Sequence, residues 1–323
     1  MSDDLEILSA WRIGAVYSIG SPETGTINRT LLVDAASGSY ALRAYRHADR
    51  SPVEREHAVI AHVCKRGLPA VAPIALPSGA TILERAGRFY SLFPRAPGRQ
   101  LTRGQLTKAD FAAMGAFLAC THQALRDVPP EYAARRNFAI DRVATLMRAD
   151  EIAGAIRARP SLDDVDRYVL DRLAARCAWI EQSPLDRLPD LSAIEQQVIH
   201  GDYQETNLFF RDGRVVAIID WDQTYPAPCA WEIVRALHLS CKFAVEPCRA
   251  FLAAYREQLP LDPDELDLVA RSYGLMRAHD LWLYRAIYFD GNDRLRQFVT
   301  PNTPVSGKYA PIMDRWDALR KTL

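Results

Sequence analysis

The stretch from Val198 to Asp222, VIHGDYQETNLFFRDGRVVAIIDWD, constrains this chain more than any other part of it. It holds two short apolar runs, Asn207–Phe210 and Val215–Ile219, with the turn Arg211-Asp212-Gly213-Arg214 between them. Asp-Gly between apolar runs is a strong signal for a β-hairpin. Because the two strands of a hairpin are antiparallel, the polar residues before the first run and after the second are expected at one edge.

Two carboxylates and an amide would meet at that edge: Asp202, Asn207 and Asp220. Hard oxygen ligands of this kind suit Mg²⁺, with no need for thiol or imidazole groups. Magnesium sites in proteins usually combine one or two carboxylates with substrate phosphates. If Asn207 and Asp220 bind the metal, Asp202 remains to orient an attacking hydroxyl and accept its proton, a division of labour found in phosphoryl transfer.

The composition is that of an ordinary soluble globular protein. The 323 residues suffice for two domains or one two-lobed domain, and the formal net charge is zero. A neutral chain argues against broad attraction to nucleic acid or membrane surfaces. The six cysteines form no CxxC pair and predict buried free thiols. With no apolar signal segment at the N-terminus and no spanning run of about 18 apolar residues, we expect a cytoplasmic protein.

The first part of the chain predicts a sheet with one helix. Residues 11–46 read as three strands, and Pro52 opens a helix. Further strands are expected at Val71–Leu76, Thr81–Leu83 and Phe89–Phe93. A proline- and glycine-rich linker, PRAPGR, follows the last of them.

The remainder predicts mostly helices around the polar hairpin. Thr107 is expected to cap a helix that runs to Leu125, and Ser161-Leu-Asp-Asp164 to form a capping box. One long helix is expected over Asp264–Phe289 and a short one over Ile312–Arg320.

HGDYQETN followed by IIDWD resembles the aminoglycoside phosphotransferase and choline kinase superfamily, which has a protein-kinase-like fold. The superfamily pattern is HGD-x-x-x-x-N, about a dozen residues, then I-D-[WF]-[DE]. Every fixed position is filled here: His200, Gly201, Asp202, Asn207, Ile219, Asp220, Trp221 and Asp222. THQAL at 121–125 and the segments GTINRTLLV, GSYALRAYR and EREHAVI extend the resemblance over about residues 10–290.

The resemblance implies an α+β fold with two lobes. Residues 1–95 would form an N-terminal nucleotide-binding lobe with a small mixed sheet and one helix. Residues 96–323 would form a larger, mostly helical lobe for catalysis and acceptor binding, with a helical insertion at about 130–190.

The resemblance also implies roles for single residues. Asp202 would be the catalytic base, and Asn207 and Asp220 would bind Mg²⁺. Arg43 falls where the family places a Lys or Arg that holds the α- and β-phosphates of ATP. Glu56 falls at its ion-pair partner and is preferred over Glu54, because Glu56 lies on the packed side of the helix. Arginine is not equivalent to lysine at this place, because its planar fork can hold two oxygens.

Further nucleotide contacts are implied in the first lobe. The adenine would lie against the linker backbone at Leu92, Phe93 and Arg95. The loop between the first two strands has the glycine spacing of a P-loop but lacks the Lys-Ser/Thr pair, so it is no Walker A motif. As a loop over the phosphates it offers Gly25 and Asn28.

Three residues are expected to support the site. His200 either packs behind the catalytic loop or acts as a nucleophile, and packing is the preferred interpretation. Asp222 either reaches the metal or braces the loop. The family usually has an Asp at the start of the next helix that steadies the catalytic loop, and Glu232 stands near that place here.

The acceptor is the least constrained part of the prediction. Asp280 and Tyr284 are candidates for acceptor binding, but interleaved arginines make this region unlike the acidic trough that polycationic aminoglycosides need. We therefore predict a small-molecule kinase that uses ATP and Mg²⁺ on a small hydroxylated metabolite: an amino alcohol, an amino acid or a sugar, with a homoserine-kinase-like role as one option. The alternatives are a protein Ser/Thr kinase and a nucleotide-binding regulator without catalysis. The oligomeric state is left open.

Overall fold

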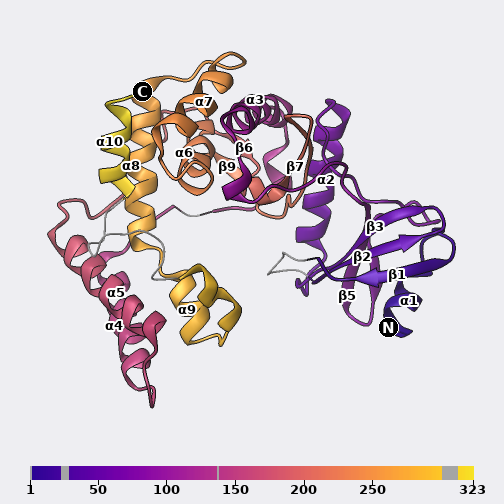
Figure 1. The fold of residues 1–323 in the computed structure, drawn as a ribbon, viewed down its shortest axis with the longest axis horizontal. Coiled ribbons are helices and arrows are strands. Elements are labelled where there is room, and N and C mark those ends of the chain that lie inside the picture. Colours follow the sequence, from indigo (N-terminus) through magenta and orange to yellow (C-terminus); the bar gives the residue numbers. More distant parts are fainter. Residues whose placement is uncertain (1, 23–28, 137, 300–311) are drawn as a thin grey trace. The chain divides into compact units, whose positions relative to one another are not determined.

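The computed structural model describes residues 2–22, 29–136, 138–299 and 312–323 (Figure 1). The chain forms two compact units, Met1–Arg136 with Ile194–Leu261 and Asn137–Ala193 with Asp262–Leu323. Sheets and helices alternate in the first unit, whereas the described part of the second is built from helices. The predicted α+β class is thus confirmed, while the predicted lobe boundary at residue 95 stays a prediction.

An antiparallel sheet of five strands carries the N-terminal part of the first unit. Its order is β1-β2-β3-β5-β4. The strands are β1 (Val16–Gly20), β2 (Arg29–Ala35), β3 (Gly38–Ala44), β4 (Leu83–Arg85) and β5 (Arg88–Pro94). The predicted strands at the start of the chain and before the linker are therefore present, with ends shifted by a few residues.

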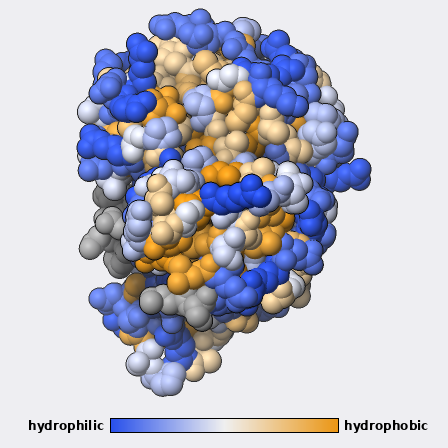
Figure 2. All heavy atoms as spheres, turned by 90° about the vertical axis from the view of Figure 1, so that its right-hand side faces the viewer, coloured by the Kyte–Doolittle hydropathy of each residue, from blue (hydrophilic) through white to orange (hydrophobic). Residues whose placement is uncertain are grey.

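Side chains alternate between the two faces of this sheet along each strand, and one of the faces is buried. In β2, Leu31 and Val33 point into a core that Leu42 of β3 also joins. The short helix α1 (Ser2–Leu8) and Trp11 pack against the same core. Figure 2 shows the molecule from the right-hand side of Figure 1. Apolar residues lie among hydrophilic ones on this surface.

The prediction of a strand at Val71–Leu76 is wrong, because this segment does not form a regular strand. Its backbone makes single bonds instead: the Ile74 amide donates to the Leu92 carbonyl at 2.7 Å, and the Leu76 amide to Ala80 at 2.7 Å. Pro73 interrupts the run and has no N–H to offer a ladder.

Helix α2 (Ser51–Lys65) follows β3 as predicted, with Pro52 in its first turn. Glu56 and His57 lie on its buried face. Gly67 follows its end with φ of +82°, a left-handed conformation that favours glycine after a helix.

The rest of the first unit holds the polar hairpin among helices. Its regular elements are α3 (Lys108–Leu125), β6 (Gln197–Ile199), β7 (Leu208–Arg211), β8 (Arg214–Ile218), β9 (Tyr225–Ala227), α6 (Cys229–Leu239) and α7 (Val245–Arg256). Short 3-10 turns occupy η1 (Arg103–Gln105), η2 (Pro130–Tyr132) and η3 (Glu205–Asn207). Thr107 caps α3 in a capping box with Asp110, so this predicted helix start is confirmed.

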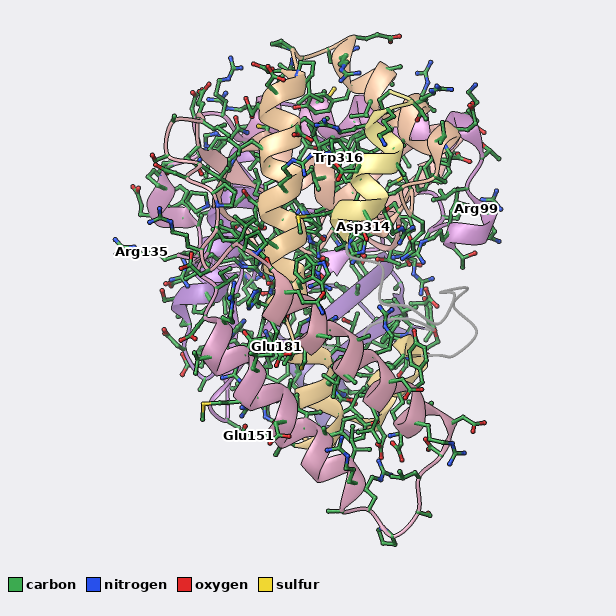
Figure 3. The ribbon with its side chains drawn as sticks, turned by 90° about the vertical axis from the view of Figure 1, so that its left-hand side faces the viewer. Arg99, Arg135, Glu151, Glu181, Asp314 and Trp316 are labelled. Atoms are coloured by element: carbon green, nitrogen blue, oxygen red, sulfur yellow. The ribbon has the colours of Figure 1, made fainter. Side chains whose placement is uncertain are left out.

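The second unit contains α4 (Arg142–Arg157), α5 (Asp164–Gln182), α8 (Pro263–His279), α9 (Trp282–Tyr288), η4 (Asp293–Phe298) and α10 (Ile312–Arg320). In Figure 3, Trp316 of α10 lies against α8, where its indole N–H donates to Asp267 at 2.8 Å. The predicted short helix at 312–320 is confirmed. No helix in the described ranges is both long and apolar enough to cross a membrane.

Two details of the second unit correct the sequence analysis. The capping box of α5 is formed by Asp163 and Asp166, not by Ser161 and Asp164, since the carboxylate of Asp163 accepts the Asp166 amide at 2.9 Å. The single helix expected over 264–289 is two helices, because Asp280 takes an extended conformation (φ −86°, ψ 108°) and ends α8.

Candidate active site

The polar hairpin forms as predicted and closes the candidate site. Strands β7 and β8 pair antiparallel with Leu208 opposite Ile218, and the Ile219 amide donates to the Asn207 carbonyl at 3.0 Å. Asp212 and Gly213 both have positive φ, as the favoured two-residue hairpin turn requires. This pairing places Asn207 beside the segment that carries Asp220.

Asp202 precedes the hairpin and is surrounded by donors. Its carboxylate accepts from the amide of Gln204 (3.2 Å to each oxygen), from the Asn207 amide (2.9 Å) and from the Arg235 guanidinium (2.5 Å). Its side chain is still 20% exposed, so a hydroxyl group can reach it. Such a carboxylate is held in one orientation, which suits alignment of an attacking hydroxyl.

Arg235 was missed by the sequence analysis. It lies on α6 three residues after Glu232, and no motif singles it out. The i to i+3 spacing on one helix was the available signal, because residues at that spacing lie on neighbouring positions of a helix surface.

Arg43 on β3 connects three carboxylates. One terminal nitrogen of its guanidinium donates to Glu56 at 2.9 Å, and the other to Asp220 at 2.7 Å and Asp222 at 3.2 Å. The structure thus gives Arg43 the expected partner Glu56, whereas Glu54 pairs with Arg50 at the surface. The contacts to Asp220 and Asp222 were not foreseen.

Burial and charge shift the protonation equilibria around Arg43. Complete burial raises the pKa of Glu56 to about 7, although the Arg43 guanidinium acts in the opposite direction. Burial also raises the pKa of Asp222, and the nearby charge of Asp220 adds to that shift. Burial alone would lower the pKa of Arg43, but the charges of Glu56 and Asp220 outweigh it and raise that pKa.

Glu232 braces the loop that carries Asp202. Its carboxylate, at the start of α6, accepts the backbone amides of His200 at 3.1 Å and Gly201 at 2.6 Å. It also contacts the imidazole Nε2 of His122 at 3.1 Å, and both side chains are fully buried. The bracing contact expected from an Asp is therefore made here through the longer side chain of Glu232.

The surroundings of the buried pair of His122 and Glu232 shift both pKa values toward the charged forms. Burial would lower the pKa of His122, but Cys229, Tyr255 and Glu232 outweigh it and raise that pKa well above its usual value. Burial would raise the pKa of Glu232, but the hydrogen bond from His122 and its charge lower it. Both shifts thus favour an imidazolium paired with a carboxylate behind the catalytic loop.

His200 is buried with both ring nitrogens engaged. Its Nδ1 accepts the Asp202 amide at 3.2 Å, and its Nε2 donates to the Ile219 carbonyl at 3.0 Å. The ring also lies 4.6 Å from that of Trp221. These contacts join the segment before the hairpin to the segment after it, which favours packing over a nucleophilic role.

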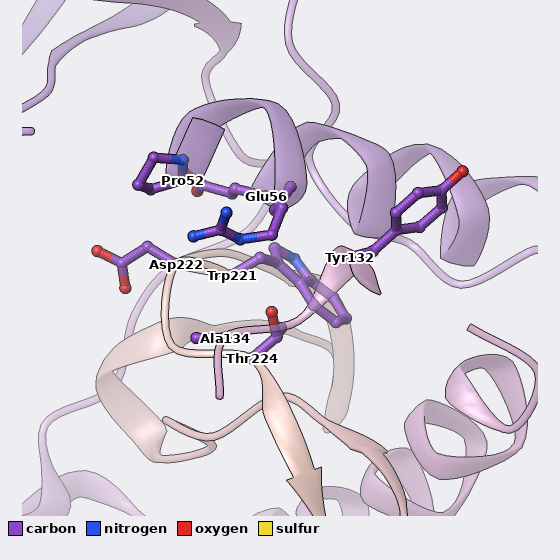
Figure 4. Close-up of a pocket in the computed structure, with 8 residues that line it drawn as sticks. Pro52, Glu56, Tyr132, Ala134, Trp221, Asp222 and Thr224 are labelled. Atoms are coloured by element: carbon purple, nitrogen blue, oxygen red, sulfur yellow. The ribbon is translucent and has the colours of Figure 1, made fainter. Parts of the chain in front are cut away.

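A small pocket lies beside this site in the first unit (Figure 4). Figure 4 shows α2, with Pro52 and Glu56, next to the loop that carries Trp221 and Asp222. The pocket is lined by Pro52, Arg55, Glu56, Tyr132, Ala134, Trp221, Asp222 and Thr224. Asp222 and Glu56 therefore border a space that solvent can enter.

The other expected nucleotide residues have varied surroundings. The Arg95 amide donates to the Ser39 carbonyl at 2.9 Å, and the Leu92 carbonyl accepts from Ile74. These two backbone groups are therefore engaged, while Phe93 is half-buried with its ring 6.1 Å from His57. Gly25 and Asn28 lie outside the described residues.

The two acceptor candidates belong to the second unit. Asp280 ends α8, where it pairs with Arg277 and accepts the Trp282 amide at 3.1 Å. Tyr284 is 7% exposed and joins the core of that unit. Both residues thus have structural contacts, and their acceptor role stays a prediction.

The residues at the hairpin exit offer a donor set for a hard divalent cation. Asp220 and Asp222 are brought to one guanidinium nitrogen, and Asn207 lies across the hairpin from them. Within the described ranges no group of three His, Cys, Asp or Glu side chains could hold a metal. A magnesium site completed by substrate phosphates needs only one or two carboxylates, so the donor set fits Mg²⁺. Asp220 also has φ of +70°, a strained conformation typical of functional positions.

The chain is similar to known phosphotransferases. The model of a family described as the phosphotransferase enzyme family (APH) matches residues 19–269. A homoserine kinase of Xanthobacter autotrophicus is 29% identical over 264 residues, covering 80% of this chain and 77% of the relative. A homoserine kinase of Rhodopseudomonas palustris is 27% identical over 284 residues, covering 85% and 82%.

Solved structures share the fold. A spectinomycin phosphotransferase, APH(9)-Ia, in complex with ADP and spectinomycin has a TM-score of 0.71 at 15% identity, covering 100% of this chain and 98% of that one. An amicoumacin kinase in complex with AMP-PNP and Ca²⁺ has a TM-score of 0.56 at 18% identity, covering 95% and 96%. A microcompartment-associated aminopropanol kinase has a TM-score of 0.59 at 15% identity, covering 92% and 94%. The predicted protein-kinase-like fold is thus confirmed.

Proposed function

The chain belongs to the phosphotransferase enzyme family, and on that premise we propose that it transfers the γ-phosphoryl group of ATP to a hydroxyl of a small metabolite. Family membership confirms two predictions made from the sequence: the superfamily, and an enzyme of the small-molecule kinase kind. The nucleotide, the metal and the residue roles below are parts of the proposal.

The proposed nucleotide and metal are ATP and Mg²⁺. Support comes from similar folds solved with ADP, or with AMP-PNP and Ca²⁺. Asp220 and Asn207 would hold the metal, with Asp222 next to them. When bound, Mg²⁺ would neutralise charge on the phosphate oxygens. Arg43 would contact the phosphates through the guanidinium that now contacts Asp220 and Asp222, while Glu56 fixes its other end.

Asp202 is the proposed base. A substrate hydroxyl bound at its exposed oxygen would donate its proton to Asp202 while the hydroxyl oxygen forms a bond to the γ-phosphorus. The bond between that phosphorus and the bridging oxygen breaks, and ADP leaves with the electron pair. The contacts from Gln204, Asn207 and Arg235 hold the carboxylate in position for this step.

A hydroxy amino acid is the first acceptor to test, because the curated relatives described above are homoserine kinases. The observation that carries the proposal is the juxtaposition itself. Asp202, Asn207 and Asp220 meet at one end of a hairpin, beside an arginine that is paired with Glu56. A regulator without catalysis would not need all of them.

The experiment is a phosphoryl-transfer assay over a panel of amino alcohols, amino acids and sugars with Mg-ATP. We expect the wild type to phosphorylate at least one of them, and Asp202→Asn to lose about 10²- to 10⁴-fold in kcat, the usual contribution of a positioned base. Asp220→Ala should lose activity together with the Mg²⁺ dependence of nucleotide binding.

Asp212→Asn is the matched control, because it changes a carboxylate at the opposite end of the same hairpin. It should leave the activity unchanged, since Asn also tolerates the left-handed conformation of that turn. If the wild type binds Mg-ATP tightly but phosphorylates none of the panel, the proposal of a metabolite kinase fails.

A further inference from the structure

Arg235 brings a positive charge to the point where an acceptor hydroxyl has to bind. Its guanidinium contacts Asp202 at 2.5 Å, and both side chains are 20% exposed. An acceptor that reaches the carboxylate of Asp202 therefore meets the guanidinium of Arg235 as well. The planar fork of arginine has several donors and matches the geometry of a carboxylate.

A second arginine, Arg136, contacts the segment that packs against the catalytic loop. Arg136 stacks on the ring of Tyr225 at 4.3 Å and donates to the side-chain oxygen of Gln223 at 2.8 Å. The segment Gln223–Tyr225 packs directly on the catalytic loop, since a Cβ at Gly201 would overlap the Gln223 carbonyl and approach the Tyr225 ring. Arg136 is therefore anchored on the segment that packs against the residue before Asp202.

The hydroxyl group of Tyr225 feels the charge of both arginines. Burial raises the pKa of Tyr225 to about 12. The charges of Arg136 and Arg235 act to lower this pKa, and the charge of Glu232 acts to raise it. Two positive charges thus act on one buried hydroxyl group beside the catalytic loop. The nearby carboxylates Asp220 and Asp222 contact a different arginine, Arg43.

We propose that Arg235, assisted by Arg136, recognises a carboxylate on the acceptor, so that the substrates of this enzyme are small hydroxy acids or hydroxy amino acids. The inference rests on the proposed function and deepens it by naming the acceptor's second group. A cationic acceptor such as an aminoglycoside would place its ammonium groups against these guanidinium groups, which is unfavourable at short range. Arg235 would then have two tasks: it positions Asp202, and it selects the anionic acceptor.

The test compares three acceptors that differ by one group. L-homoserine carries a hydroxyl, an ammonium and a carboxylate; 4-hydroxybutanoate lacks the ammonium; 3-aminopropan-1-ol lacks the carboxylate. For the wild type we expect kcat/KM of both carboxylates to exceed that of 3-aminopropan-1-ol by about 10- to 100-fold, the worth of a hydrogen bond between charged groups.

Arg235→Gln separates the two tasks of this residue. Misplacement of Asp202 lowers kcat for all three acceptors alike, whereas loss of carboxylate recognition raises KM for L-homoserine and 4-hydroxybutanoate only. We expect their advantage over 3-aminopropan-1-ol to fall to within about threefold. Arg235→Lys keeps the charge and should restore part of that advantage, and Arg136→Gln should reduce it by a smaller factor.

Arg256→Gln is the matched control, because it removes an exposed arginine at the end of α7. It should change neither kcat nor the ratio between acceptors. Equal losses for all three acceptors in Arg235→Gln, or a wild type that prefers 3-aminopropan-1-ol, would overturn the inference while leaving a metabolite kinase in place. A wild type that phosphorylates no hydroxyl compound at all would overturn the proposed function itself.

Discussion

Removal of the Glu232 carboxylate is expected to destabilise the first unit strongly. Glu232→Ala leaves two buried backbone amides, those of His200 and Gly201, without their acceptor. It also leaves the imidazolium of His122 buried without its counter-ion. Removing one partner of a buried ion pair costs about 3–5 kcal/mol, and each unsatisfied buried donor about 1–3 kcal/mol. Because these losses share one site, they do not add, and we expect a total near 4 kcal/mol.

Two further substitutions of Glu232 separate the contributions of its charge and of its side-chain length to this loss of stability. Glu232→Gln keeps the shape and one acceptor oxygen, but its NH2 group then faces a backbone N–H donor and its charge is lost, so it should lose about 2 kcal/mol. Glu232→Asp keeps the charge on a shorter side chain, and it tests whether the longer side chain is needed to reach Gly201. Glu257→Ala, at an exposed position after α7, is the control and should change stability by less than about 0.5 kcal/mol.

The assay is urea unfolding at pH 7, together with hydrogen exchange of the His200 and Gly201 amides. Glu232→Ala should lower the unfolding free energy and speed the exchange of these two amides. A loss below about 1 kcal/mol with unchanged exchange would refute the reasoning, because it would mean that neither the ion pair nor the amide contacts stabilise the loop.

The same pair predicts how stability depends on pH. The raised pKa of His122 contributes stability that is fully present below the ordinary value of 6.5 and is lost as the pH rises through the folded pKa. The lowered pKa of Glu232 contributes stability that is present above the ordinary value of 4.5 and is lost as the pH falls through the folded pKa.

Other predictions concern separate sites. Burial lowers the pKa of His57 to about 4 from 6.5, so stability should fall by about 3 kcal/mol as the pH drops through that window. His57→Gln should abolish this dependence in urea unfolding at pH 4.5 and 7, and an unchanged slope would exclude His57 as its source. Arg43→Lys cannot keep both arms of the fork, so KM for ATP should rise about tenfold, and an unaltered KM would contradict a phosphate contact. Gly115→Ala should cost about 2 kcal/mol, because its Cβ would overlap the backbone of Phe251. Gly154→Ala, with open space around it in α4, should instead stabilise by about 0.5–1 kcal/mol, and similar thermal shifts for both variants would refute this steric explanation.

Local signals in the sequence were sufficient where the structure depends on neighbouring residues. Asp-Gly at 212–213 predicted the turn, and Thr107 predicted the start of α3. Local signals failed where a run of apolar residues was compatible with more than one secondary structure. Val71–Leu76 has the composition of a strand but contains Pro73, and Asp280 ends a helix whose apolar pattern continues beyond it.

The sequence by itself determined the chemistry proposed for this protein. The spacing of Asp202, Asn207 and Asp220 is short, and one hairpin with a fixed register brings these residues together. Only the tertiary structure decided what surrounds them, because those contacts join residues far apart in the chain. Arg43 meets Asp220 across 177 residues, His122 meets Glu232 across 110, and Arg235 meets Asp202 from the next helix. No local pattern specifies such contacts, because they depend on how whole helices and strands pack. The hairpin therefore indicates phosphoryl transfer. We propose that the acceptor is selected by charges from other parts of the chain, namely Arg235 on α6 and Arg136.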